Sequence, residues 1–348
     1  MKKPFKLLSM LTLTASLLAL SACGASPAVS STPTPEAQTA TPSATASATP
    51  EATPEASEEP VFPRTIVDAN GVEVVIEQQP QRIAVGLFRF LEHWYALDMP
   101  PAAASNSDDL LSNWESLKPY ASKAEVVDLG YPVNLELLLD VAPDVIIAST
   151  PHNDEVYEEM AKVAPVVSFS TAAVADDWRA ALRSFAEVVG REEKAEEFIS
   201  GVEERARAAK EKFVNEYSDK TFAYLVITDL NTFGAYNKKT MSAFYDKDTG
   251  LGLNAPVGYP EGDGTGHSEN FTLEGLATLN PDYIFVRGDS ASDTEEKQLE
   301  ELSANSVWSS LSAVKNGKVF ILDRSAFSGG PIAVEYGLNT VIEVLSNP

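Results

Sequence analysis

The stretch that decides the fold is residues 134–150, NLELLLDVAPDVIIAST, which returns later in the chain as residues 272–287, TLEGLATLNPDYIFVR. At a constant offset the two copies share several identical residues, among them the glutamates Glu136 and Glu274. Each copy has the pattern of a short amphipathic helix, a Pro-Asp stop and a continuous apolar run typical of a buried strand. The repeat predicts two equivalent α/β lobes, with a cleft between them.

The ends of the two predicted helices carry their own signals. Asn134 and Thr272 stand where an N-cap residue would accept hydrogen bonds from the free N–H groups of the first helical turn. Pro143 and Pro281 cannot continue a helix, so each predicted helix ends before its proline. Both copies therefore have the same predicted limits.

The flanking sequence extends this pattern. An Asn70-Gly71 turn predicts a hairpin at the start of the folded part, and strand and helix signals then alternate, which favours mainly parallel sheets with helices on both faces. Residues 176–216 carry no strand signal and predict two helices separated at Gly190. The second, about residues 192–216, would be roughly 35 Å long, enough to cross from one lobe to the other. We expect a first lobe over residues 61–175, a helical segment over 176–216 and a second lobe over 217–348.

The N-terminus predicts export and anchoring. Residues 1–22 have the positive start and apolar centre of a signal peptide, and residues 20–23, LSAC, resemble the lipobox of bacterial lipoproteins. Cys23, the only cysteine, would then become the lipidated N-terminus. Residues 24–60 are almost entirely Ala, Ser, Thr, Pro and Glu, a composition that cannot offset the entropy of folding. We expect residues 23–60 to be a disordered tether, which suits the thick wall of a Gram-positive-type envelope.

Charge and motifs exclude several classes of function. With 26 Lys+Arg against 51 Asp+Glu the formal net charge is −25, which disfavours binding to nucleic acid. The sequence has no G-x-S-x-G elbow, P-loop, H-E-x-x-H or paired-cysteine site, so we do not expect an enzyme. The three histidines, His93, His152 and His267, are not spaced as metal ligands, and no metal site is expected.

Six motifs in order carry a resemblance to a known family. They are IVDANGVEVVIEQQPQRIAV, NLELLLDVAPDVII, YEEMAKVAPVV, FAEVVGREEKAEEFI, FTLEGLATLNPDYIFV and VWSSLSAVKNGKVFILD, the last followed by GGPIAVEYGLNTVIEVL. Together, behind a lipobox, they resemble the ABC-importer substrate-binding lipoproteins that take up ferric siderophores, haem or cobalamin, the class III periplasmic binding proteins. The segment LDMPP at residues 97–101 departs from the family's usual Leu-Gly turn.

The resemblance implies an α/β fold of two Rossmann-like lobes bridged by a single long α-helix. It implies a monomer on the outer face of the cell membrane that binds a ferric siderophore without a cofactor. The protein would deliver this ligand to a two-subunit ABC permease with a cytoplasmic ATPase, and Glu136 and Glu274 match the family's permease-docking positions. Each glutamate would also stabilise the positive end of its own helix dipole, so the two roles stay open together.

Candidate ligand contacts follow from the rule that ligands bind beyond the carboxyl ends of strands in open α/β sheets. The residues at predicted strand ends or in adjoining loops are Arg89, Tyr131, His152, Tyr236, Tyr259, Arg287, Arg324 and Phe327. Arginines there would attract an anionic ferric chelate, although each is equally compatible with a structural ion pair. The four tryptophans are interpreted as packing residues. Haem held by His152 or His267, cobalamin, or a non-transport sensor lipoprotein remain alternatives.

Overall fold

Both copies of the repeat form the predicted unit. Helix α3 (Leu135–Val141) precedes strand β6 (Val145–Thr150), and α9 (Leu273–Leu279) precedes β11 (Tyr283–Gly288). The Asn134 side chain accepts from the amide of Glu136 at 2.9 Å, and Thr272 accepts from Gly275 at 3.1 Å, so both N-caps are confirmed.

The aspartate after each proline makes a hydrogen bond to the backbone that the repeated sequence did not predict. Asp144 accepts from the backbone amide of Gln81 at 2.7 Å, just before strand β3 (Ile83–Val85). Asp282 accepts from the amide of Thr221 at 2.9 Å, just before strand β8 (Phe222–Asp229). In each lobe this carboxylate therefore ties the repeat to the start of the neighbouring strand.

The computed structural model describes residues 62–262, 269–289 and 292–347, all within one compact unit. The predicted signal peptide, Cys23, the tether up to residue 60 and His267 lie outside the described residues. In the part of the chain that is described, no helix combines the length and the apolar character needed to span a bilayer.

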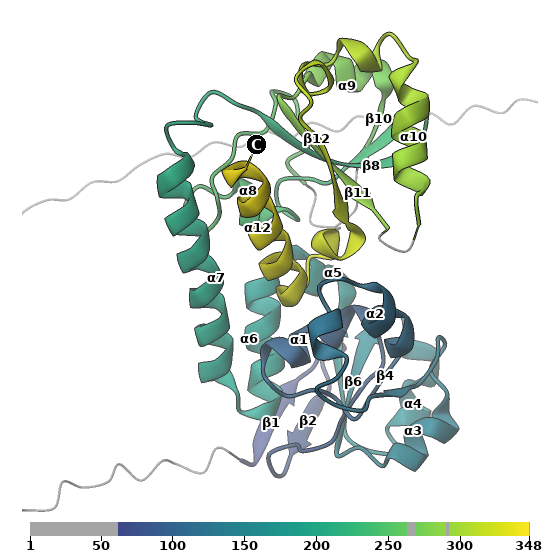
Figure 1. The fold of residues 1–348 in the computed structure, drawn as a ribbon. Helices are drawn as coiled ribbons and strands as arrows, with labels where there is room; N and C mark the ends of the chain where they lie inside the picture. Colours follow the sequence, from purple (N-terminus) through teal and green to yellow (C-terminus); the bar gives the residue numbers. More distant parts are fainter. Residues whose placement is uncertain (1–61, 263–268, 290–291, 348) are drawn as a thin grey trace, which may run out of the picture. The chain divides into compact units, whose positions relative to one another are not determined.

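The first lobe is built on five parallel strands in the order β5-β4-β3-β6-β7 (Figure 1). Its remaining strands are β3 (Ile83–Val85), β4 (Ala103–Ala104), β5 (Val127–Asp128) and β7 (Val166–Ser170). Its other helical segments are η1 (Phe88–Phe90), α1 (Leu91–Ala96), α2 (Ser107–Asn113), η2 (Lys118–Tyr120), η3 (Asp154–Val156), α4 (Tyr157–Met160) and α5 (Thr171–Asp176). A hairpin of β1 (Arg64–Val67) and β2 (Glu73–Ile76) precedes the sheet, as the Asn70-Gly71 turn predicts.

The second sheet has the order β10-β9-β8-β11-β12. Its remaining strands are β8 (Phe222–Asp229), β9 (Thr232–Ala235), β10 (Glu269–Thr272) and β12 (Val319–Asp323). Its other helical segments are α8 (Ser242–Tyr245), α10 (Thr294–Ser303), η4 (Trp308–Ser310), α11 (Ser312–Lys315), η5 (Arg324–Phe327) and α12 (Pro331–Ser346). Strands β8, β11 and β12 are parallel, whereas β9 runs antiparallel to both of its neighbours, β8 and β10, an antiparallel edge that the sequence did not predict.

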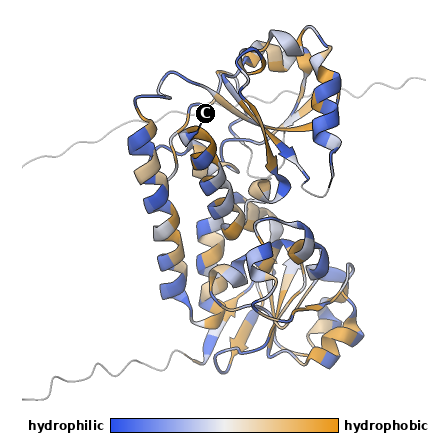
Figure 2. Cartoon of the chain, in the orientation of Figure 1, coloured by the Kyte–Doolittle hydropathy of each residue, from blue (hydrophilic) through white to orange (hydrophobic). Residues whose placement is uncertain are grey.

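The apolar run of β6 is continuous because both faces of the first sheet are covered. Val145 and Ile147 belong to the large core, while Ile146 and Ala148 belong to a second cluster on the opposite face. A strand buried on both faces has no solvent-facing positions, so it lacks the polar alternation of a half-exposed strand. Figure 2 shows the same contrast, with hydrophobic residues gathered on strands and hydrophilic ones along α7 and α10.

Two long helices follow the first lobe, α6 (Trp178–Val189) and α7 (Glu192–Phe213). They are separated at Gly190, whose φ of +66° is the left-handed conformation that glycine adopts freely. Helix α7 begins beside β1, where Glu192 pairs with Arg64, and near its end Lys210 donates to the Lys247 carbonyl in the second lobe. The bridging helix is thus confirmed, although it ends at Phe213 rather than at residue 216.

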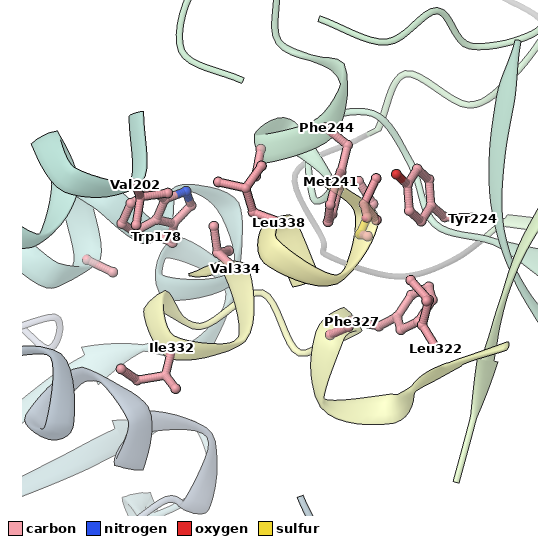
Figure 3. Packing of buried hydrophobic residues seen from close by; sticks show 14 of the residues in the cluster. Trp178, Val202, Tyr224, Met241, Phe244, Leu322, Phe327, Ile332, Val334 and Leu338 are labelled. Carbon is pink, nitrogen blue, oxygen red and sulfur yellow. The ribbon is translucent and has the colours of Figure 1, made fainter. Parts of the chain in front are cut away.

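The C-terminal helix α12 packs between elements of both lobes. It contacts α1 and α6 as well as α7, α8 and η5. Figure 3 shows Val334 and Leu338 of α12 near Trp178 of α6, Val202 of α7 and Phe244 of α8. The large core therefore runs through both lobes, because one cluster joins buried side chains from β3 to α12.

Candidate functional site

A cavity of about 660 Å³ is lined by residues of both lobes. The first lobe contributes side chains from η1, α1 and α2, from the loop after β6, and from α5. The second contributes residues that follow β9, lie at the end of β11, or follow β12. These are carboxyl ends of strands, where ligands bind in open α/β sheets.

Six of the eight predicted ligand contacts line this cavity, and they are Arg89, His152, Tyr236, Arg287, Arg324 and Phe327. Sequence positions far apart meet here because the parallel strands of each sheet end at the same edge, whereas Tyr236 follows the antiparallel strand β9. Arg287 lies within β11 rather than after it, paired in register with Leu322 of β12.

Arg324 is held by acids from both lobes. One guanidinium nitrogen lies 3.3 Å from Asp289 of the second lobe, and another lies 3.8 Å from Asp109 on α2 of the first. The same guanidinium lies 5.9 Å from the centre of the Trp114 ring, within cation–π range. The charge of Arg324 is therefore largely compensated by the protein itself.

Arg89 and Arg287 are less engaged. Arg287 donates to the Tyr236 hydroxyl at 3.3 Å, and the Tyr236 ring centre lies 5.1 Å from that of Phe327. Arg89 is exposed and lies 5.9 Å from the Phe88 ring, and its side chain makes no hydrogen bond or ion pair with the residues described. These two arginines, one from each lobe, keep donors available for an anionic ligand.

His152 is oriented by two hydroxyl groups. Its Nδ1 lies 3.2 Å from Thr171 Oγ1 and 3.5 Å from Ser149 Oγ. The two hydroxyl groups also lie 2.6 Å from each other, and Thr171 Oγ1 lies 3.3 Å from the Thr150 carbonyl, so His152 belongs to a small hydrogen-bonded cluster at the end of β6.

The two remaining predicted contacts lie elsewhere. Tyr131 is 59% exposed and does not line the cavity, although its ring meets that of the lining residue Phe88 edge-on, with centres 5.9 Å apart. Tyr259 is 3% exposed, and its hydroxyl lies 3.0 Å from both the amide and the carbonyl of Tyr224. Burial raises the pKa of Tyr259 above its ordinary value. Its position is that of a core residue that supports β8.

Glu136 and Glu274 occupy equivalent exposed positions, each the second residue of its helix. Their side chains make no ion pair within the part of the chain described, so both carboxylates face solvent. Neighbouring positions differ: Leu137 is exposed at the position where the second copy has Gly275.

Several lining residues were not predicted, among them Phe88, Asn106, Asp109, Trp114 and Thr240. The interpretation of the tryptophans as packing residues fits Trp94, Trp178 and Trp308, which are buried, but Trp114 lines the cavity. Trp114 gave no signal of its own, because it follows a short helix with no strand pattern beside it.

Glu92 is the unpredicted residue with the most unusual surroundings. It lies on α1 in the apolar segment LEHWYA, and its side chain is 2% exposed although it lines the cavity. Burial raises the pKa of Glu92 to about 7, while hydrogen bonds from Ser328 and Ala333 act in the opposite direction. Its neighbour His93 is equally buried, which lowers the pKa of that imidazole to about 3. The sequence signal that could have pointed to Glu92 is a charged residue inside a mostly apolar helix.

The cavity is locally positive on an acidic chain. Arg324 is compensated by Asp109 and Asp289, but Arg89 and Arg287 form no ion pair with the residues described, and the raised pKa of Glu92 lowers its share of negative charge. The chain as a whole carries −25. Across residues 62–262, 269–289 and 292–347, no group of three or more His, Cys, Asp or Glu is arranged to hold a metal ion.

Comparisons with known proteins agree with this architecture. Residues 89–326 match the family model described as "Periplasmic binding protein". The chain is 27% identical over 240 residues to the iron(3+)-hydroxamate-binding protein YxeB of Bacillus subtilis, covering 67% of this chain and 73% of YxeB. It is 30% identical to the iron(3+)-hydroxamate-binding protein FhuD of the same organism, covering 64% of this chain and 69% of that protein.

A solved structure gives the same picture. The triscatecholate siderophore binding protein FeuA from Bacillus subtilis, in complex with ferri-bacillibactin, superposes with a TM-score of 0.62 at 26% identity. The match covers 81% of this chain and 98% of that one. These relatives are binding proteins, not enzymes. With more than half of its length matched by the family model, and with two α/β lobes joined by a long helix around a lined cavity, this chain belongs to the periplasmic binding protein family.

Proposed function

We propose that this protein captures a ferric siderophore in the cavity between its lobes. The observation that carries the proposal is the pair of available arginines, Arg89 from the first lobe and Arg287 from the second, which line one cavity in a chain of −25. Arginine recognises anionic oxygens with strong, directed hydrogen bonds. The rings of Phe88, Trp114 and Tyr236 supply flat apolar surface for an organic chelator.

The named relatives support the class of ligand. Two are named for binding iron(3+)-hydroxamates, and the FeuA structure holds ferri-bacillibactin. Another relative, at 24% identity, is named as an Fe(3+)-citrate-binding protein. The chemistry of the chelator thus varies among them, and the ferric complex is the cargo rather than a cofactor of the protein.

Delivery to an ABC permease is the second part of the proposal. Glu136 and Glu274 are exposed at equivalent positions of the two lobes, as docking on two equivalent permease subunits requires. The permease would be paired with a cytoplasmic ATPase, and the binding protein would act as a monomer. A relative named "Putative ABC transporter substrate-binding lipoprotein YhfQ" supports this assignment.

We also propose that Cys23 carries the lipid anchor on the outer face of the cell membrane, with residues 24–60 as a tether. Replacing Cys23 by serine should release the protein into the medium and abolish incorporation of labelled palmitate, because two or more acyl chains are needed for stable anchoring. Cell fractionation of the two forms measures this. A C23S protein that stays in the membrane fraction at the wild-type level would contradict the anchor.

The ligand proposal is tested by titrating residues 57–348, one compact unit, with ferric hydroxamate, catecholate and citrate complexes, and also with haem and cobalamin. Trp114 lines the cavity, so binding should quench tryptophan fluorescence. We expect saturation by at least one ferric siderophore. Tighter binding of haem or cobalamin would assign the cavity to that ligand instead of a ferric siderophore. If the protein binds its ligand but deletion of its gene leaves uptake unchanged, a sensor would be favoured.

A further inference from the structure

Glu92 makes both of its hydrogen bonds to the other lobe. Its carboxylate accepts from the Ser328 hydroxyl at 2.5 Å and from the Ala333 amide at 2.7 Å. Glu92 lies on α1 of the first lobe, whereas Ser328 and Ala333 lie at the end of η5 and in the first turn of α12. Both hydrogen-bond donors to this buried carboxyl group of the first lobe therefore come from the second lobe.

The first turn of α12 lacks a cap of its own. The helix begins at Pro331, and the N-cap residue is Gly330, which has no side chain to accept from the free amides. A Cβ at Gly330 would lie 2.6 Å from Glu92 Oε2. Glycine at this position leaves the room that Glu92 occupies, and the carboxylate takes over the capping of Ala333.

The segment held in this way is a wall of the cavity. Arg324, Phe327 and Ser328 line the cavity directly before α12, and η5 packs against α12. We propose that Glu92 is a positioning residue of the binding site: from the first lobe it caps α12 and fixes the Arg324–Ser328 wall. Because this carboxyl group is buried, the contact should also depend on pH. The inference rests on the proposed function only where it concerns ligand affinity.

The direction of the pH effect follows from burial. The pKa of Glu92 rises from 4.5 to about 7 in the folded protein, so between these values the folded state holds a proton that the unfolded state has lost. The stability that Glu92 contributes is fully present below pH 4.5 and is lost as pH rises through about 7. The total loss corresponds to a change of about 300-fold in the unfolding equilibrium. An anionic ligand beside Glu92 would favour the protonated form further, so affinity should also fall as pH rises.

The expected pH dependence is assigned to Glu92 and not to a neighbouring charged group. None of the residues described forms an ion pair with Glu92. The elements around it carry further ionisable groups, which include Arg89 on η1, His93 and Tyr95 on α1, Tyr120 on η2, Arg179 and Arg183 on α6, Arg205 on α7, Arg324 on η5, and Glu335 and Tyr336 on α12. Arg179 and Arg205 pair with Glu203 and Glu335, and the low pKa of His93 keeps it neutral.

The test compares Glu92→Gln, Glu92→Ala and the matched control Glu211→Gln, an exposed glutamate on α7, in the ligand-free chain. Hydrogen exchange at the Ala333 amide should be at least tenfold faster in Glu92→Ala and within threefold of wild type in Glu92→Gln, which keeps an acceptor. The melting temperature of wild type and of Glu211→Gln should fall between pH 5 and pH 8 more than that of Glu92→Gln.

Two results would overturn the inference: Ala333 exchange unaffected by Glu92→Ala, or a Glu92→Gln variant that keeps the wild-type pH slope. Both are measured without ligand, so they are independent of the proposed function.

With ferri-bacillibactin or ferric citrate, whichever binds wild type, Glu92→Ala should bind at least tenfold more weakly. The Kd of wild type divided by the Kd of Glu92→Gln should rise from pH 6 to pH 8. Any pH dependence of the chelate itself affects both Kd values equally and cancels in this ratio. Unchanged affinity would refute the positioning role, whereas failure of every probe to bind wild type would count against the proposed ligand.

Discussion

Replacing both Arg89 and Arg287 with alanine is expected to weaken binding of an anionic ferric chelate by at least about 100-fold. A hydrogen bond to a charged partner contributes about 1.5–3 kcal/mol, which is roughly 10–150-fold for each arginine. The two side chains line the cavity from different lobes, and neither forms an ion pair with the residues described, so their donors remain for the ligand. Fluorescence titration of the single and double variants measures the effect.

Two comparisons sharpen this result. Arg207→Ala removes an equal charge from an exposed position on α7 and should leave affinity unchanged. Arg324→Ala should have a smaller effect than Arg287→Ala, because Asp109 and Asp289 already compensate that guanidinium. Wild-type affinity in the double Arg89 and Arg287 variant would remove both arginines from the site.

Reversing the charge at both Glu136 and Glu274, as Glu136→Lys with Glu274→Lys, is expected to abolish uptake while ligand binding persists. Like charges brought together at an interface cost several kcal/mol, so docking on basic permease residues should fail. Both positions are exposed and lie outside the cavity lining. Cellular uptake of the radiolabelled ferric complex, compared with the Kd of the purified variant, separates docking from binding.

The matched control places lysines on the same helices at exposed positions, Asp140→Lys with Thr278→Lys. Each glutamate also stabilises its helix end by about 0.3–1 kcal/mol, so the melting temperature of every variant must be recorded. Normal uptake by a folded, ligand-binding double Glu variant would refute docking through these residues.

Much of the fold was readable because the repeat carries redundant signals. Caps at Asn134 and Thr272, prolines after each helix and fully apolar strands all indicate the same unit. The antiparallel edge was missed because β9 and β10 are four residues each and contain no apolar run. Their pairing depends on β8, whose register no local pattern reveals. The lobe limits at residues 61, 175 and 217 stay predictions.

The site was predictable where it depends on strand ends. Arg287 and Arg324 follow from the position of β11 and β12, and both line the cavity. Tyr131 and Tyr259 lie in loops, where sequence gives no direction for a side chain. Glu92 was missed for a different reason: its partners, Ser328 and Ala333, lie in the other lobe more than two hundred positions later. Such a contact exists only after the lobes have assembled.

The cavity between the lobes is proposed to hold a ferric siderophore. A titration of residues 57–348 with a panel of ferric siderophores, haem and cobalamin, followed by tryptophan fluorescence, tests this claim. We expect saturable quenching by a ferric siderophore with one site per chain, and loss of that affinity in the Arg89 and Arg287 double variant. Binding of haem or cobalamin alone, or of no member of the panel, would contradict the claim.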